Sequence, residues 1–108
     1  MRMWMVDVRY MCDAHLRQEH NDVHAIQRRL RAKTSTTDII AEPMSVFKRH
    51  EALAHEMLKR NFAHNSPLKK LHSVNKDQII WSTESLAELL AGCKSCRERV
   101  LNAQSVDS

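Results

Sequence analysis

Glycine and proline are scarce in this sequence of 108 residues, which holds one glycine and two prolines. Sheet-rich folds need these residues at their many tight turns, so their scarcity argues against a β architecture. Helices joined by a few polar loops are favoured instead. The chain also has no run of about eighteen apolar residues of the kind that crosses a membrane, so no transmembrane helix and no membrane partner are predicted.

Signals for secretion are also lacking. Asp7 interrupts the opening stretch before a hydrophobic leader region could form. The three cysteines are an odd number, which fits reduced thiols better than a disulfide framework. We therefore expect a cytoplasmic protein.

The composition fits one small globular unit with a basic surface. Apolar residues make up 43% of the chain, enough for a modest core, and we expect a single domain over residues 1–108. Lysine and arginine exceed the acids by 17 to 13, for a net charge of +4. This excess fits an ordinary basic surface as well as a nucleic-acid partner. Two basic regions stand out, one at Arg28, Arg29, Arg31 and Lys33 and one at Lys59, Arg60, Lys69 and Lys70, which also holds His64 and His72.

Apolar spacing predicts an all-α domain with three main helices and an extended lead-in over residues 1–9. The first helix covers about 11–32, with Asp13 as its cap or first-turn acid. A polar break at 34–38 precedes a second helix from about Pro43 to 61, and a turn follows at 65–67. The third helix begins at about 82 and continues past Gly92, to about 101.

The first helix carries an unusual polar stripe. His15, Glu19 and Asp22 follow one another at helical spacing and share one face. One interpretation is a solvated face, with the core on the opposite residues. Another is a metal site, because His20 and His24 lie four residues apart with His15 nearby.

Cysteines and tryptophans also leave alternatives open. Cys93 and Cys96, together with Cys12 and one histidine, could form a structural zinc site. The alternative is that both C-terminal cysteines lie on the buried face of the third helix, because reduced cysteine is often buried. For Trp4 and Trp81 we expect core packing rather than insertion into a DNA stack.

Several ordered segments resemble the small pyrimidine-dimer DNA glycosylases of the endonuclease V type. The similarity begins with residues 1–7, Met-Arg-Met-Trp-Met-Val-Asp, and continues at 11–16 and 19–24. It extends through 49–53, 56–62, 64–68 and 93–99. The resemblance implies an all-helical DNA-repair enzyme that cleaves the glycosidic bond and then nicks the strand as an AP lyase.

The resemblance also implies site residues. The family's nucleophile is the α-amino group of the mature N-terminus, which forms a Schiff base with C1′ of the damaged nucleotide. This role falls on Met1, which should be retained because Arg2 follows it. An α-amine is a weaker base than a lysine side chain, so more of it is neutral and able to attack at pH 7. The family's histidine falls on His15, and its catalytic glutamate falls on Asp22.

Expected partners follow from the same resemblance. Phosphate contacts with damaged double-stranded DNA are expected from Arg2, Arg17, Arg28 and Arg29. The protein is expected to act as a monomer, without a cofactor or catalytic metal. Asp22 is one methylene shorter than the family's glutamate, and Glu19 on the same face could partly substitute for it. The alternatives are therefore an inactive DNA-binding relative and a zinc-stabilised interaction module.

Overall fold

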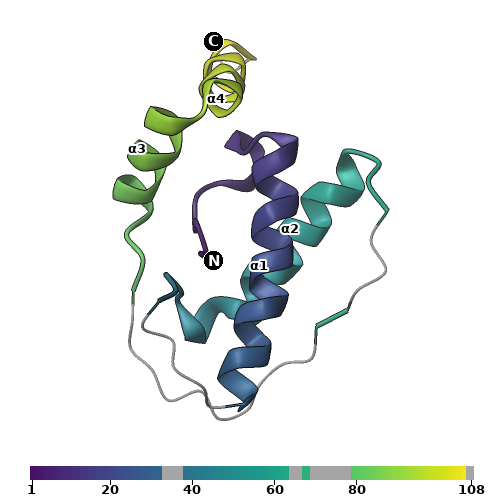
Figure 1. Cartoon of the computed structure of the whole chain (residues 1–108). Coiled ribbons are helices and arrows are strands. Elements are labelled where there is room, and N and C mark those ends of the chain that lie inside the picture. The colour runs from purple at the N-terminus through teal and green to yellow at the C-terminus, as the bar shows by residue number, and fades with distance from the viewer. Residues whose placement is uncertain (33–37, 64–66, 69–78, 107–108) are drawn as a thin grey trace.

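The computed structural model describes residues 1–32, 38–63, 67–68 and 79–106. Within these ranges the prediction of an all-α fold is confirmed, with four α-helices and two short 3-10 helices (Figure 1). The α-helices are α1 Asp13–Ala32, α2 Val46–Lys59, α3 Ser82–Gly92 and α4 Lys94–Val106, and the 3-10 helices are η1 Val8–Tyr10 and η2 Pro43–Ser45. None of the described helices is long and apolar enough to cross a membrane.

Some predicted features fall outside the described residues. These are most of the polar break at 34–38, the first two residues of the turn at 65–67, and five basic residues: Lys33, His64, Lys69, Lys70 and His72.

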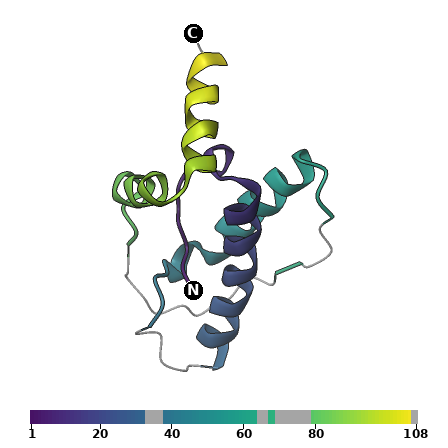
Figure 2. The same ribbon diagram turned by 45° about the horizontal axis from the view of Figure 1, so that its top comes forward.

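The prediction of one long third helix is wrong, because the chain breaks between α3 and α4. Cys93 has an extended backbone, with φ −141° and ψ 110°. Gly92, the last residue of α3, is a weak helix former, so ending the helix there costs little. The Arg97 guanidinium donates to the carbonyl oxygen of Leu90 at 2.7 Å and so satisfies one of the last carbonyls of α3. As a result α4 runs in a different direction and projects from the body (Figure 2).

The N-terminal lead-in threads between α1 and α3 (Figure 1). Arg2 forms an isolated parallel β-bridge with Ile40, and the Met3 N–H donates to the Ile40 carbonyl at 2.7 Å. Met3 is fully buried and Val6 is 3% exposed, so these residues belong to the core. The expected extended lead-in is shorter than predicted, because η1 begins at Val8.

The core lies where the lead-in meets the packed faces of α1 and α2. Leu16, Val23 and Ile26 of α1 and Leu53 of α2 are fully buried. Trp4 packs against this core, as expected. The prediction for Trp81 is wrong: this side chain precedes α3 and is 66% exposed.

A buried ion pair joins α1, α2 and the lead-in. Arg49 of α2 contacts both carboxylate oxygens of Glu19 on α1, at 2.6 and 2.8 Å. The same guanidinium donates to the carbonyl of Val6 at 2.7 Å and to the sulfur of Met11 at 3.3 Å. Glu19 is fully buried and Arg49 is 7% exposed. One side chain therefore holds three separate segments.

Replacing Arg49 with leucine should lower the free energy of unfolding by about 3–5 kcal/mol, because it leaves the Glu19 charge buried without its partner. The double variant Arg49→Leu/Glu19→Leu should recover a large part of that loss, because no buried charge remains. Urea unfolding monitored by circular dichroism measures both effects.

The matched control is Arg9→Ala. It removes an arginine whose ion pair with Asp7 is exposed, so it should cost no more than about 1 kcal/mol. Equal losses for Arg9→Ala and Arg49→Leu would contradict the structural role given to Arg49.

Candidate active site

Asp22 lies in the middle of α1 with its carboxylate turned toward the lead-in. The carboxylate Oδ2 accepts a hydrogen bond from the backbone N–H of Arg2 at 3.2 Å. Its Oδ1 accepts one from the Gln18 side chain at 3.0 Å, four residues earlier on the same helix. Asp22 is 9% exposed, so it is a nearly buried acid with a fixed orientation. The sequence prediction missed Gln18, although its spacing from Asp22 was a usable signal.

Residue 1 is held beside this acid from two sides. The peptide nitrogen that donates to Asp22 is bonded to the Met1 carbonyl carbon, and the Met1 carbonyl oxygen accepts from the Ile40 N–H at 3.3 Å. Met1 is nevertheless 43% exposed. The backbone that follows the α-amino group is therefore fixed beside a buried carboxylate, while residue 1 remains open to solvent.

An ion pair between Arg29 and Asp38 lies on the same side of α1. Arg29 follows Asp22 by seven residues, about two helical turns, and so shares its face. Its guanidinium contacts the Asp38 carboxylate at 2.6 Å. This hydrogen bond is the main cause that lowers the pKa of Asp38 below its ordinary 3.8, and the positive N-terminal amine adds a smaller lowering. Asp38, which the sequence analysis did not single out, is thus an exposed acid near the N-terminal amine.

Arg2 connects the lead-in to α3. Its guanidinium lies 3.7 Å from the centre of the Trp4 ring, pairs with Glu88 at 2.6 Å and donates to the Ser85 hydroxyl at 3.1 Å. Ser85 in turn donates to the Trp4 carbonyl. The Arg2 charge is thus already compensated by an acid of α3.

A small pocket of about 180 Å³ adjoins Arg2. Three apolar side chains in its lining are exposed, Ile40 at 47%, Ile79 at 63% and Trp81 at 66%. Isolated exposed apolar residues are common, but three around one pocket form a surface on which a flat apolar group can pack. The remaining lining residues are Arg2, Ile80, Glu84, Ser85 and Glu88.

His15 and Glu19 share the helix face of Asp22 but have different partners. The Glu19 carboxylate is occupied by Arg49. The His15 Nδ1 lies 3.3 Å from the Cys12 sulfur and 3.7 Å from the Cys96 sulfur. Of the three stripe residues, only Asp22 contacts the backbone next to Met1.

Two histidine and cysteine clusters occur within the described part of the chain. His20 and His24 meet His50 of α2 rather than His15, with ring centres 4.8–4.9 Å apart. His15 instead joins Cys12, Cys93 and Cys96.

The thiols in the second cluster differ in environment. Burial raises the pKa of Cys96 to about 12. Burial acts in the same direction on Cys93, but hydrogen bonds from Cys96 and Cys12 outweigh it and leave the pKa of Cys93 lowered.

The other arginines expected to bind DNA lie on α1. Arg28 is exposed at the last turns of the helix. Arg17 is also exposed, and its guanidinium lies 4.1 Å from the centre of the Phe62 ring. Together with Arg29 they distribute positive charge along the helix that carries Asp22.

A family model described as pyrimidine dimer DNA glycosylase matches residues 1–70. The matched span contains the lead-in, α1 and α2, including Met1, Gln18 and Asp22, and it ends before α3 and α4. Neither a curated protein nor a solved structure matches the chain.

Proposed function

Because the chain belongs to the pyrimidine dimer DNA glycosylase family, we propose that it cleaves damaged pyrimidine nucleotides through a Schiff base on the α-amine of Met1 and then nicks the strand as an AP lyase. One observation carries this proposal: the Asp22 carboxylate accepts a hydrogen bond from the backbone N–H next to Met1 at 3.2 Å. This hydrogen bond supports the proposal because it fixes the Asp22 carboxylate beside residue 1, whose amine we propose as the nucleophile, and covalent catalysis requires a nearby acid–base group.

In the proposed reaction the neutral Met1 amine attacks C1′ of the damaged nucleotide. A C–N bond forms as the bond between C1′ and the base breaks, and the base leaves as an anion that takes a proton from water. One amine proton then moves to the ring oxygen O4′ as the C1′–O4′ bond breaks, which leaves a protonated imine on the ring-opened sugar. Asp22 stabilises this positive charge. It also acts as the base for removal of a C2′ proton, after which the C3′–O bond breaks and the strand is nicked. Gln18 keeps the carboxylate in place.

The damaged nucleotide or its partner base must leave the helical stack before the amine can reach C1′. The exposed apolar surface of Ile40, Ile79 and Trp81 adjoins Arg2 and is suited to receive an extruded base. Binding of an extruded base would explain why Trp81 is exposed, which core packing does not explain.

Phosphate contacts would supply most of the DNA affinity. Arg28 is exposed and suited to such a contact, whereas Arg29 is already paired with Asp38 and Arg2 with Glu88. We therefore propose Arg28 and Arg17 as phosphate ligands, and a positioning role for Arg2 beside the nucleophile.

A catalytically inactive DNA-binding relative is the second candidate, and the short side chain of Asp22 favours it. Compared with glutamate, aspartate withdraws the carboxylate by about one ångström, and displacements of that size can cost a hundredfold in rate. Nicking of ultraviolet-irradiated plasmid DNA, with unirradiated plasmid as the control, separates an enzyme from a binding protein.

Borohydride should trap a covalent adduct between the protein and DNA that contains an abasic site. Mass spectrometry of the adduct should locate it at Met1, and intact-mass measurement should show that the chain begins there. Acetylating the N-terminus should abolish trapping, because an amide nitrogen does not form an imine. An adduct on a lysine would exclude the proposed nucleophile.

Asp22→Asn should reduce nicking by about a hundredfold or more while damaged-DNA affinity stays within a few fold, because the variant keeps an acceptor but loses the base. Asp22→Glu should equal or exceed the native rate. The matched control is Asp13→Asn, which changes an exposed acid on the same helix and should leave the rate unchanged. Nicking by Asp22→Asn at the native rate would exclude Asp22 from catalysis.

Arg28→Ala should flatten the slope of log affinity against log salt by about 0.9, because one phosphate contact is lost. It should weaken binding to damaged and undamaged DNA alike. Lys94→Ala removes the same charge at the start of α4, and fluorescence anisotropy should show an unchanged slope. Equal slopes for native protein and Arg28→Ala would mean that Arg28 does not contact phosphate.

A further inference from the structure

We propose that Cys12, His15, Cys93 and Cys96 form a structural zinc site that holds α4 and the α3–α4 junction against the start of α1. The reaction proposed above uses Met1, Gln18 and Asp22, none of which is a ligand here, so the two proposals can fail independently. His15, on which the family's histidine falls by resemblance, is a metal ligand in this proposal. Two of its ligands also lie beyond the span that the family model matches.

The spacing of the four side chains fits a tetrahedral ion. All four ligand atoms lie within 4.8 Å of one another. Zn–S bonds of about 2.3 Å in a tetrahedron separate two sulfurs by about 3.8 Å, and a sulfur from a nitrogen by about 3.6 Å. The Cys12 and Cys93 sulfurs are 3.8 Å apart, and the His15 Nδ1 lies 3.3 Å from Cys12 and 3.7 Å from Cys96. The set therefore needs little movement to close on a metal.

The ligands come from two short half-sites, each at the start of a helix. Cys12 and His15 are three residues apart where α1 begins, and Cys93 and Cys96 are three residues apart where α4 begins. Paired ligands at this spacing are characteristic of structural zinc sites with three cysteines and one histidine. The Cys12 backbone N–H donates to the Cys96 sulfur at 3.2 Å, a contact of the kind that supports a thiolate ligand.

All three cysteines are free thiols. A disulfide requires sulfurs about 2.05 Å apart, and the Cys12 and Cys93 sulfurs lie well beyond that distance. Trp4 covers one side of the cluster, since its ring packs edge-on against His15 with centres 5.7 Å apart. The arrangement is thus that of converging ligands, partly shielded by an aromatic side chain.

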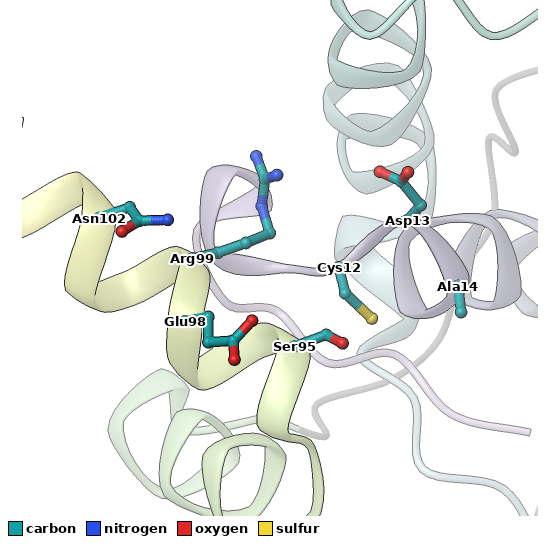
Figure 3. Close-up of a pocket in the computed structure, with 7 residues that line it drawn as sticks. All are labelled: Cys12, Asp13, Ala14, Ser95, Glu98, Arg99 and Asn102. Carbon is teal, nitrogen blue, oxygen red and sulfur yellow. The ribbon is translucent and has the colours of Figure 1, made fainter.

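A pocket of about 370 Å³ provides a route from solvent to the cluster. It lies between the beginning of α1 and α4, and the Cys12 thiol is directed into it toward Ser95 (Figure 3). Access of this kind allows an ion to enter a folded or nearly folded chain. Ala14, Asp13, Glu98, Arg99 and Asn102 complete its lining.

The weak attachment of α4 gives the proposed metal a structural purpose. Of the α4 side chains that the structure describes, only Cys96 is buried. Arg99 adds a hydrogen bond to the Arg9 carbonyl at 2.9 Å, but it is an exposed contact. When the terminal helix of a small domain buries so little apolar surface, a metal ion that cross-links it to the rest of the chain adds substantially to stability.

The test measures zinc in the full chain, purified with a reductant and without chelators. We expect about one zinc per chain, and X-ray absorption at the zinc edge should show three sulfurs at about 2.3 Å and one nitrogen at about 2.0–2.1 Å. Chelation should lower the melting temperature, and added zinc should restore it. This measurement on the unmodified protein requires no variant to fold.

Cys93→Ser removes a ligand that is only half-buried and should weaken zinc affinity by more than about a hundredfold, since even outer-shell changes cost 10–100-fold. The matched control is His24→Gln, which alters the separate histidine cluster and should leave the zinc content unchanged. A chain that stays zinc-free after incubation with zinc, or one that binds it only through nitrogen and oxygen, would overturn the proposal. So would loss of zinc in His24→Gln but not in Cys93→Ser, or a disulfide between Cys12 and Cys93.

Discussion

The guanidinium of Arg49 lies where α1, α2 and the N-terminal lead-in meet, and it contacts all three. Its bidentate contact with Glu19 fixes the two long helices, and its bond to the Val6 carbonyl fixes the path of the lead-in. That path brings residue 1 to Asp22. Its contact with the Met11 sulfur fixes the position of Met11, the residue that directly precedes Cys12. Both proposed sites therefore depend on one buried charge, and a buried charge is tolerated only with such complete pairing.

The polar stripe on α1 shows how three polar groups on one helix face, two of them buried and His15 partly buried, acquire separate roles. Asp22 turns toward the lead-in, Glu19 toward Arg49 and His15 toward the sulfurs. Each has a partner from a different part of the chain, as burial of a polar group requires. A solvated face would need no such partners. The three side chains of the stripe therefore help to hold the lead-in in place along α1.

Periodicity and local signals in the sequence predicted the long helices well, because α1 and α2 bury regular apolar faces. The break at Cys93 could not be predicted, since Gly92 alone costs a helix only about 1 kcal/mol and the deciding contacts come from distant residues. The same applies to Arg49, whose burial depends on Glu19 thirty positions earlier. Helical spacing singled out Asp22 and the family resemblance suggested its role. The sequence offered the grouping of Cys12 with Cys93 and Cys96 only as one of two alternatives, and the fold was needed to show that these side chains and His15 lie within 4.8 Å of one another.

The contacts of the lead-in also impose an order on biosynthesis. Residues 1–7 leave the ribosome long before α3, yet Arg2 and Trp4 bond to Ser85, and Arg2 also pairs with Glu88. A nascent chain that has reached only the end of α2 cannot yet form these bonds. The hydrogen bonds that hold Met3 and Val6 come from Ile40, Glu42 and Arg49, so this part of the lead-in can be fixed earlier, once α2 has emerged. The lead-in is therefore fixed in two stages, first against residues 40–49 and then, through Arg2 and Trp4, against α3.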